Sequence, residues 1–169
     1  LFGLILIICL YEMNKLRKGK RKTLPFLYVI IPLILIHTFN QDTVLSIFII
    51  TCLFDSFAYI IGVNFGRHKM IPTISPKKSW EGFFGGFVIT ILITYYATQF
   101  QNLNLSLNWI EVLIIPISAT IGDFTASYYK RLADVKDSGK IIPGHGGIID
   151  RMDAFMISIP VIFITNIYL

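Results

Sequence analysis

Long apolar segments alternate with short polar loops along this chain, and this pattern constrains the fold more than any other feature. Only 15% of the 169 residues are charged, whereas soluble domains carry about 25%. A bilayer crossing takes about 20 helical residues, and five apolar segments approach or reach that length. They cover residues 24–39, 43–63, 82–101, 109–129 and 154–169. Since a segment in hydrocarbon must satisfy its own backbone hydrogen bonds, we predict an all-α fold, a polytopic transmembrane helical bundle with about five full spans.

The apolar run Leu1–Tyr11 is too short to cross a bilayer alone. The chain begins with Leu, and no basic segment precedes the run as it would in a signal peptide. We interpret this run as the tail of a truncated N-terminal span. No repeat or low-complexity segment stands out, so we expect residues 1–169 to form a single membrane domain.

Basic residues are confined to one side of the predicted membrane topology. All 15 Lys and Arg residues lie in loops 12–23, 64–81 and 130–153, whereas the alternate loops 40–42 and 102–108 have none. Loops rich in Lys and Arg face the cytoplasm. The net charge of +5 therefore reflects topology and phosphate binding better than nucleic-acid binding, and we expect an integral protein of the bacterial inner (cell) membrane. Both cysteines lie inside apolar runs, which argues against a disulfide framework.

Two carboxylates, Asp55 and Asp123, interrupt apolar segments at a similar depth, about 10 Å below the cytoplasmic surface. A charge at such a depth costs roughly 2.5–3.5 kcal/mol, so each acid is expected to face a cavity and have a partner. The alternative is a protonated acid that makes an interhelical hydrogen bond. Small or polar residues recur beside each acid at helical spacing, which predicts that both point into the bundle. These neighbours are Ser118, Ala119, Gly122, Ala126 and Ser127 for Asp123, and Cys52, Ser56 and Tyr59 for Asp55.

Asp150 and Asp153 are three residues apart at the start of the last apolar segment, so they share a face of its first helical turn. Acids at a helix N-terminus are also explained by plain capping. With Asp123 nearby, they would instead form an oxygen-rich site of the kind that Mg²⁺ prefers.

The segment Pro143–Gly147 has the composition of an anion-binding turn, in which successive backbone N–H groups point at a phosphate. A plain tight turn is the alternative. Five basic residues surround this segment in the sequence, which favours a triphosphate site: Lys130, Arg131, Lys136, Lys140 and Arg151. His145 could donate to a phosphate oxygen or make a structural hydrogen bond, but a phosphate nucleophile needs no base near neutral pH.

A second polar loop, Ser75–Gly82, offers further phosphate ligands. Lys77 and Lys78 supply positive charge, and the hydroxyls of Ser75 and Ser79 can donate hydrogen bonds. The adjacent Trp80 fits an interface anchor better than a stacking partner for a base. The glycines that follow, Gly82, Gly85 and Gly86, are best explained by close helix packing.

Three segments taken together resemble the phosphatidate cytidylyltransferase (CDP-diacylglycerol synthase) family. They are Asp55–Tyr59 with Gly62 and Gly66-Arg67, then Ser75–Gly82, and finally Gly122-Asp123 with Ser127–Asp153. The last segment is the most specific, since it joins Lys-Arg, Lys-Asp, Pro-Gly-His-Gly-Gly and Asp-Arg-Met-Asp in order. One departure is Ala126, which stands where this family often has Glu.

The resemblance implies transfer of a cytidylyl group from CTP to phosphatidate, giving CDP-diacylglycerol and pyrophosphate, with residues 55–153 as the catalytic region. It implies Mg²⁺, with room for a second cation, contact with membrane lipid, and a homodimer. The implied metal ligands are Asp123 and Asp150, with Asp153 as a third ligand or as a residue that supports the other two. The implied catalytic residues are Asp123, Lys130, Arg131, Lys136, Asp137, His145, Asp150 and Arg151. The implied substrate-binding residues are Asp55, Ser75, Lys77, Lys78, Ser79, Ser127, Gly144, Gly146 and Gly147.

Three other functions are compatible with acids inside a membrane protein. An ion or proton transporter would place them near the midplane with access from both sides, but the uncharged outer loops offer no matching funnel. A non-catalytic, truncated membrane homologue and the same chemistry on another lipid phosphate both remain open.

Overall fold

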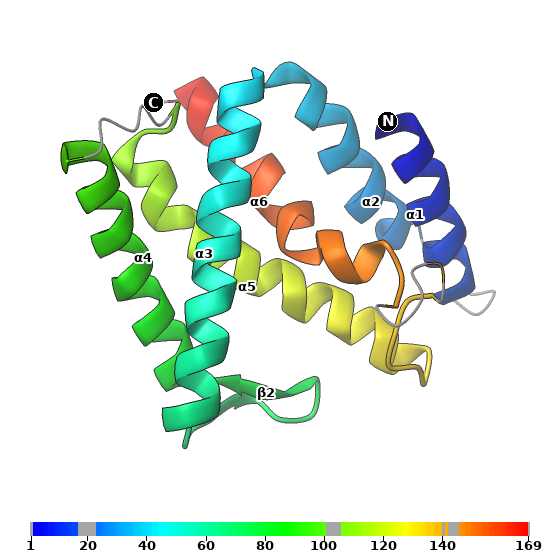
Figure 1. The fold of residues 1–169 in the computed structure, drawn as a ribbon. Coiled ribbons are helices and arrows are strands. Elements are labelled where there is room, and N and C mark those ends of the chain that lie inside the picture. The colour runs from blue at the N-terminus through cyan, green and yellow to red at the C-terminus, as the bar shows by residue number, and fades with distance from the viewer. Residues whose placement is uncertain (1, 17–22, 101–105, 140, 142–145, 169) are drawn as a thin grey trace. The chain divides into compact units, whose positions relative to one another are not determined.

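The computed structural model describes residues 2–16, 23–100, 106–139, 141 and 146–168, and these are predominantly helical (Figure 1). This confirms the prediction of a helical protein. The helices are α1 (Phe2–Leu16), α2 (Leu24–Leu35), a short 3₁₀ helix η1 (Ile36–Thr38), α3 (Gln41–Phe65), α4 (Trp80–Phe100), α5 (Trp109–Leu132) and α6 (Ile149–Tyr168). Two strands, β1 (Lys69–Ile71) and β2 (Ser75–Ser79), lie between α3 and α4.

Within the described ranges, four helices are long and apolar enough to cross a bilayer: α3, α4, α5 and α6. The chain is therefore that of a membrane protein. The segment predicted as a span over residues 24–39 forms α2 and η1, which together make a shorter apolar helix, Leu24–Thr38. The predicted number of about five full spans is accordingly not confirmed.

A small antiparallel hairpin departs from the strictly all-α prediction. Lys69 pairs with Ser79 and Ile71 pairs with Ser75. The backbone N–H of Trp80 also donates to the carbonyl of His68 at 2.9 Å, which closes the hairpin where α4 begins. The strands lie outside the long apolar segments, so their backbone groups can be satisfied by strand pairing instead of a helix.

The chain forms two compact units. Unit 1 comprises residues 1–38 and 118–169, and unit 2 comprises residues 39–117. The single domain expected from the sequence stays a prediction.

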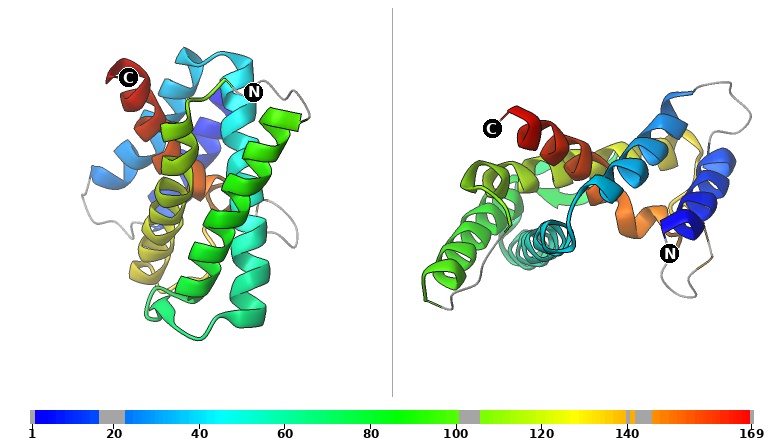
Figure 2. Two further views of the ribbon diagram at one scale, coloured as in Figure 1. Left: turned by 90° about the vertical axis from the view of Figure 1, so that its left-hand side faces the viewer. Right: turned by 90° about the horizontal axis from the view of Figure 1, so that it is seen from above.

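In unit 2, α3 and α4 run side by side, with the hairpin at one end of the pair (Figure 2). Glycines allow the two backbones to meet. A Cβ atom added to Gly86 would lie 2.7 Å from the backbone nitrogen of Ala58, and one added to Gly82 would lie 2.9 Å from Cα of Gly62. A Cβ on Gly85 would likewise meet Ile61 at 2.6 Å. The predicted close packing of these glycines is confirmed.

The buried face of α3 is not the one predicted around Asp55. Phe54 and Gly62 are buried, but Cys52, Ser56 and Tyr59 are exposed, and Tyr59 retains 63% of its accessible surface. The prediction for this face is therefore wrong. The glycine contacts with α4 decide the orientation of α3, because they require the face carrying Ala58 and Gly62 to point at α4.

In unit 1, the predicted small face around Asp123 is confirmed. Ser118, Ala119, Gly122 and Ala126 are all buried. At the centre of this face, a Cβ atom added to Gly122 would collide with the carbonyl oxygen of Asp153 on α6. One turn earlier on α5, Oγ of Ser118 lies 3.0 Å from Oγ of Ser158.

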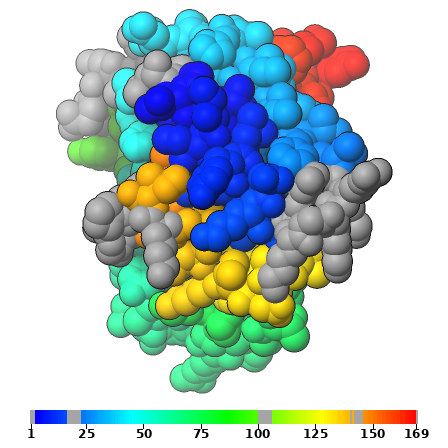
Figure 3. Space-filling model, turned by 90° about the vertical axis from the view of Figure 1, so that its right-hand side faces the viewer, coloured from blue at the N-terminus to red at the C-terminus, as the bar shows by residue number. Residues whose placement is uncertain are grey.

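The hydrophobic core of unit 1 joins α1, α2, α5 and α6 with the residues that follow α5. Its buried members are Cys9, Met13, Leu16, Val29, Leu33, Ala126, Ala133, Ile149 and Met156. In the space-filling view, α1 lies against the segments that end α5 and begin α6 (Figure 3). This core fixes the start of α6 against α1, which is the arrangement that positions the candidate site.

Candidate active site

Two carboxylates, Asp123 of α5 and Asp153 of α6, come together in unit 1 and are called the acid pair below. Their side chains are close enough to share a hydrogen bond. The contact follows from Gly122, because the absence of a side chain there brings the α5 backbone against the α6 backbone. Two carboxylates at this separation repel each other, so the pair requires a shared proton or a bound cation.

The hydroxyl of Tyr28 holds the two helices at the level of the acid pair. Its oxygen lies 3.1 Å from the carbonyl oxygen of Gly122 and 3.2 Å from that of Asp153, so the two carbonyls share its single proton. The ring of Tyr28 also packs at a tilt against Tyr129 of α5, with centroids 5.9 Å apart. Through these contacts of Tyr28, α2 stabilises the geometry of the acid pair.

A buried ion pair lies beside the acid pair. Nζ of Lys130 lies 2.8 Å from Oδ1 of Asp150, and the two side chains are 12% and 11% exposed. Lys130 is also near enough to Asp153 to attract it electrostatically. Lys130 therefore pairs directly with Asp150 and also attracts the acid pair.

The second oxygen of Asp150 organises the loop before α6. Oδ2 accepts hydrogen bonds from the backbone N–H of Ser138 at 2.8 Å and from the backbone N–H of Gly147 at 2.9 Å. It also lies 3.0 Å from Oγ of Ser138, whose single proton it shares with Glu12. Ser138 and Gly147 lie before α6, so these bonds hold the loop, and the capping alternative for Asp150 stays a prediction. Hydrogen bonds from backbone N–H groups and from Lys130 both favour the ionised carboxylate.

The donor set of the acid pair fits a magnesium ion. Magnesium is bound by one or two carboxylates, with waters and substrate phosphates completing its shell. No group of three His, Cys, Asp or Glu side chains in the described part of the chain is arranged to hold a metal by itself. Both oxygens of Asp150 already accept hydrogen bonds, so Asp123 and Asp153 fit the ion better, and the role of Asp150 as a metal ligand stays a prediction.

Glu12 is a site residue that the sequence interpretation missed. Its side chain is 1% exposed. Oε1 accepts a hydrogen bond from the N–H of Ile148 at 3.1 Å, and Oε2 accepts bonds from the N–H of Ile149 at 3.0 Å and from Oγ of Ser138 at 2.9 Å. The sequence placed Glu12 in a basic loop, but it falls on the same helical face as Cys9, Met13 and Leu16, which are buried. This helical periodicity is the feature of the sequence that could have identified Glu12 as a buried residue.

The remaining predicted residues of unit 1 are distributed around this centre. Arg131, Lys136, Asp137 and Arg151 are exposed, and Ser127 is half-buried. Arg131 donates from Nη1 to the carbonyl of Val135 at 3.3 Å. Exposure leaves these cations accessible to a soluble anionic substrate.

The predicted phosphate-binding turn is described only in part. Gly146 has a backbone φ of +83°, a conformation that favours glycine. The N–H of Gly147 donates to Asp150 and thus serves the loop. Pro143, Gly144 and His145, with Lys140, lie outside the described residues.

The predicted residues of unit 2 include one with a clear structural role. Ser79 is 2% exposed, and its Oγ accepts the N–H of Gly82 at 3.2 Å, as a helix cap does. In the same hairpin Lys77 is exposed, and Ser75 and Lys78 are half-buried, as is Asp55 on α3. Their substrate-binding roles stay predictions.

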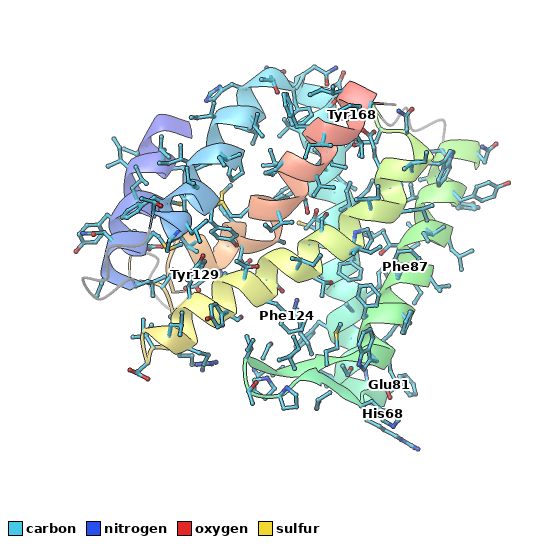
Figure 4. The ribbon with its side chains drawn as sticks, turned by 180° about the vertical axis from the view of Figure 1, so that it is seen from behind. His68, Glu81, Phe87, Phe124, Tyr129 and Tyr168 are labelled. Atoms are coloured by element: carbon cyan, nitrogen blue, oxygen red, sulfur yellow. The ribbon has the colours of Figure 1, made fainter. Side chains whose placement is uncertain are left out.

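An acid–histidine contact fixes the base of this hairpin. Glu81 accepts hydrogen bonds from the backbone N–H of Arg67 at 3.2 Å and of His68 at 3.1 Å, and its Oε1 lies 2.6 Å from Nδ1 of His68 (Figure 4). The carboxylate at the start of α4 therefore holds the two residues that precede β1.

Trp80 begins α4 and stacks on the ring of Phe84 at 5.8 Å. It is 46% exposed, as expected for an aromatic residue at a membrane interface.

Comparison with known proteins agrees with the resemblance found in the sequence. The model of the Cytidylyltransferase family matches residues 1–169. The chain is 43% identical over 122 residues to a protein of Staphylococcus epidermidis named phosphatidate cytidylyltransferase, an alignment that covers 70% of this chain and 46% of that protein. Proteins of the same name from Staphylococcus haemolyticus and Staphylococcus aureus (strain COL) are 42% and 41% identical over the same shares. The chain spans about half the length of these curated relatives. The match over its whole length shows that the chain belongs to the Cytidylyltransferase family.

Proposed function

We propose that this protein transfers a cytidylyl group from CTP to phosphatidate, yielding CDP-diacylglycerol and pyrophosphate in phospholipid synthesis. The observation that carries the proposal is the acid pair beside the buried Lys130–Asp150 pair, in a chain of this family. The names of the staphylococcal relatives point to the same substrates. Nothing among the described residues favours a transporter or chemistry on another lipid phosphate.

The reaction is an in-line displacement at phosphorus. A phosphate oxygen of phosphatidate attacks the α-phosphorus of CTP, a new P–O bond forms, and the bond from the α-phosphorus to the bridging oxygen breaks to release pyrophosphate. Such a reaction depends mainly on positioning and on stabilisation of negative charge. It needs no nucleophilic side chain, and a phosphate nucleophile needs no general base.

Cationic side chains of the chain would supply much of this stabilisation. We assign Lys130, Arg131, Lys136 and Arg151 to phosphate oxygens, and the same role in unit 2 to Lys77 and Lys78. Lys130 is held in place by Asp150, so its charge is positioned before substrate binds. Of the exposed cations in unit 1, Lys136 lies in the loop after α5, whereas Arg131 lies in the last turn of α5 and Arg151 in the first turn of α6.

Magnesium is the cofactor that the acid pair fits. Asp123 and Asp153 would hold the ion, with Asp150 as a third or indirect ligand, and room remains for a second cation. When bound, the ion would polarise phosphate oxygens and offset charge on the leaving pyrophosphate. Asp137 and His145 stay assigned as catalytic residues. The other residues assigned to substrate binding are Asp55, Ser75, Ser79, Ser127, Gly144, Gly146 and Gly147.

We further propose an orientation in the bacterial inner membrane with the active site facing the cytoplasm. All 15 Lys and Arg residues lie in loops that the positive-inside rule assigns to the cytoplasm, where CTP is also available. In this topology α3–α6 cross the bilayer, and α2 with η1 crosses as a shorter fifth span with local thinning of the lipid. A homodimer is part of the proposal on family resemblance alone.

Labelled CTP and phosphatidate test this function directly. Membranes containing the protein should form CDP-diacylglycerol and pyrophosphate in equal amounts with Mg²⁺, and neither product after chelation. Diacylglycerol, which lacks the phosphate nucleophile, is the matched negative control, and a polyprenyl phosphate tests the alternative lipid. Absence of product from phosphatidate, or better turnover of the polyprenyl phosphate, would contradict the proposal.

A further inference from the structure

Glu12 is a buried acid that accepts three hydrogen bonds, and the reaction does not explain its role. Both carboxylate oxygens are used: one accepts from Ile148, and the other accepts from Ile149 and Ser138. The three donors come from the loop between α5 and α6 and from the start of α6. A single side chain of α1 therefore ties together two segments that lie more than one hundred residues further along the chain.

The loop closes around this carboxylate without spare room. A Cβ atom added to Gly147 would lie 2.5 Å from Oε1 of Glu12 and would collide with Oγ of Ser138. One added to Gly139 would collide with the same oxygen of Glu12. With 1% exposure and these close neighbours, Glu12 has no access to a substrate.

Ser138 connects Glu12 to the site. Its Oγ lies 2.9 Å from Oε2 of Glu12 and 3.0 Å from Oδ2 of Asp150, and its backbone N–H donates to Asp150 at 2.8 Å. Asp150 in turn pairs with Lys130 at 2.8 Å. The chain of contacts thus runs from α1 through Ser138 and Asp150 to the buried cation.

We propose that Glu12 is a positioning residue: it fixes Ser138 and the first turn of α6, and thereby sets the position of Asp150 and Lys130 for the transferred phosphate. The catalytic part of this inference rests on the proposed function. Residues that orient the groups of a site in this way typically change activity by about 10–100-fold when they are replaced.

Glu12→Gln is the informative variant, because it keeps the size of the side chain but replaces one acceptor oxygen with an NH₂ group facing N–H donors. Glu111→Gln is the matched control: Glu111 is also 1% exposed, and its Oε2 accepts the N–H of Asn108 at 2.8 Å at the start of α5 in unit 2. Ser138→Ala removes the connecting hydroxyl and leaves the bonds of Glu12 to Ile148 and Ile149.

Turnover should distinguish positioning from simple support of the fold. We expect Glu12→Gln to lower kcat by about 10-fold or more with KM for CTP changed less than about 2-fold, while Glu111→Gln stays near wild type. Because Glu12 and Ser138 act through the same contact, kcat of the double variant Glu12→Gln/Ser138→Ala should be little lower than kcat of Glu12→Gln alone. Wild-type kcat in folded Glu12→Gln, or losses that multiply in the double variant, would overturn the proposal. If Glu12→Gln does not fold, wild-type kcat in Ser138→Ala would overturn it as well.

Tryptic cleavage at Lys136, an exposed residue of the same loop, gives a readout that needs no activity. We expect cleavage about 10-fold faster in Glu12→Gln than in wild type or Glu111→Gln, because the loop loses its anchor. Equal rates would overturn the positioning role. If the wild-type protein transfers no cytidylyl group, the proposed function fails, and this comparison still decides whether Glu12 holds the loop.

Discussion

Nζ of Lys130 lies 2.8 Å from Oδ1 of Asp150, and this contact joins the last turn of α5 to the first turn of α6. Each charge lies at the helix end that favours it, since a helix dipole stabilises cations near its C-terminus and anions near its N-terminus. The pair is nearly buried, so it sets the distance between the two helix ends as well as the position of the cation.

Removal of one partner from this ion pair should be costly. We expect Asp150→Asn to lower the free energy of unfolding by about 3 kcal/mol, because Lys130 would keep a buried charge without its partner. Denaturant titration of the detergent-solubilised protein measures this. Asp42→Asn, at an exposed position in the first turn of α3, is the control and should change little. The double variant Lys130→Met/Asp150→Asn should lower the free energy of unfolding by less than the sum of the two single variants. Strictly additive decreases would show that the two residues are not coupled.

Gly122 should tolerate no side chain. We expect Gly122→Ala to destabilise the protein by about 1–3 kcal/mol and to reduce turnover, because the new Cβ would push α5 away from the backbone of Asp153 and separate the acid pair. Gly3→Ala is the matched control, since a Cβ there meets nothing within 4 Å. Equal stability of the two variants would contradict the close approach of α5 and α6.

Glu81 should protect the hairpin from protease. The carboxylate of Glu81 binds the backbone N–H groups of Arg67 and His68 and the ring of His68. We therefore expect Glu81→Gln to accelerate tryptic cleavage at Lys77 and Lys78, which mass spectrometry of the early fragments can follow. Unchanged cleavage would mean that strand pairing alone holds the turn.

The positions of the helices were largely predictable because apolar length and helical periodicity are local properties. The predicted segment 109–129 corresponds to α5, and the small residues around Asp123 form a buried face as expected. The hairpin was not predicted, since its strands are short and its base is held by the contact between Glu81 and His68. The face around Asp55 was predicted wrongly because the orientation of α3 is set by glycine contacts with α4, and not by the small and polar residues beside Asp55.

The candidate site was predictable in its acids but not in their partners. The sequence predicted that Asp150 and Asp153 lie near the start of α6. Only the fold shows that Asp150 pairs with Lys130 and that Asp153 lies close to Asp123. Glu12 and Tyr28 escaped prediction because their partners are backbone groups and Ser138, which lie far away in the sequence. The helical periodicity of α1 marks the position of Glu12 as buried, but no local pattern identifies the partners of either side chain.

Turnover of Asp123→Asn tests the central claim most directly, since Asn keeps the shape of the side chain but removes the charge that would bind Mg²⁺. With labelled CTP, phosphatidate and saturating Mg²⁺, folded Asp123→Asn should form no detectable CDP-diacylglycerol, whereas Asp42→Asn should match the wild-type protein. Normal product formation by Asp123→Asn would contradict the assignment of the acid pair as the metal site.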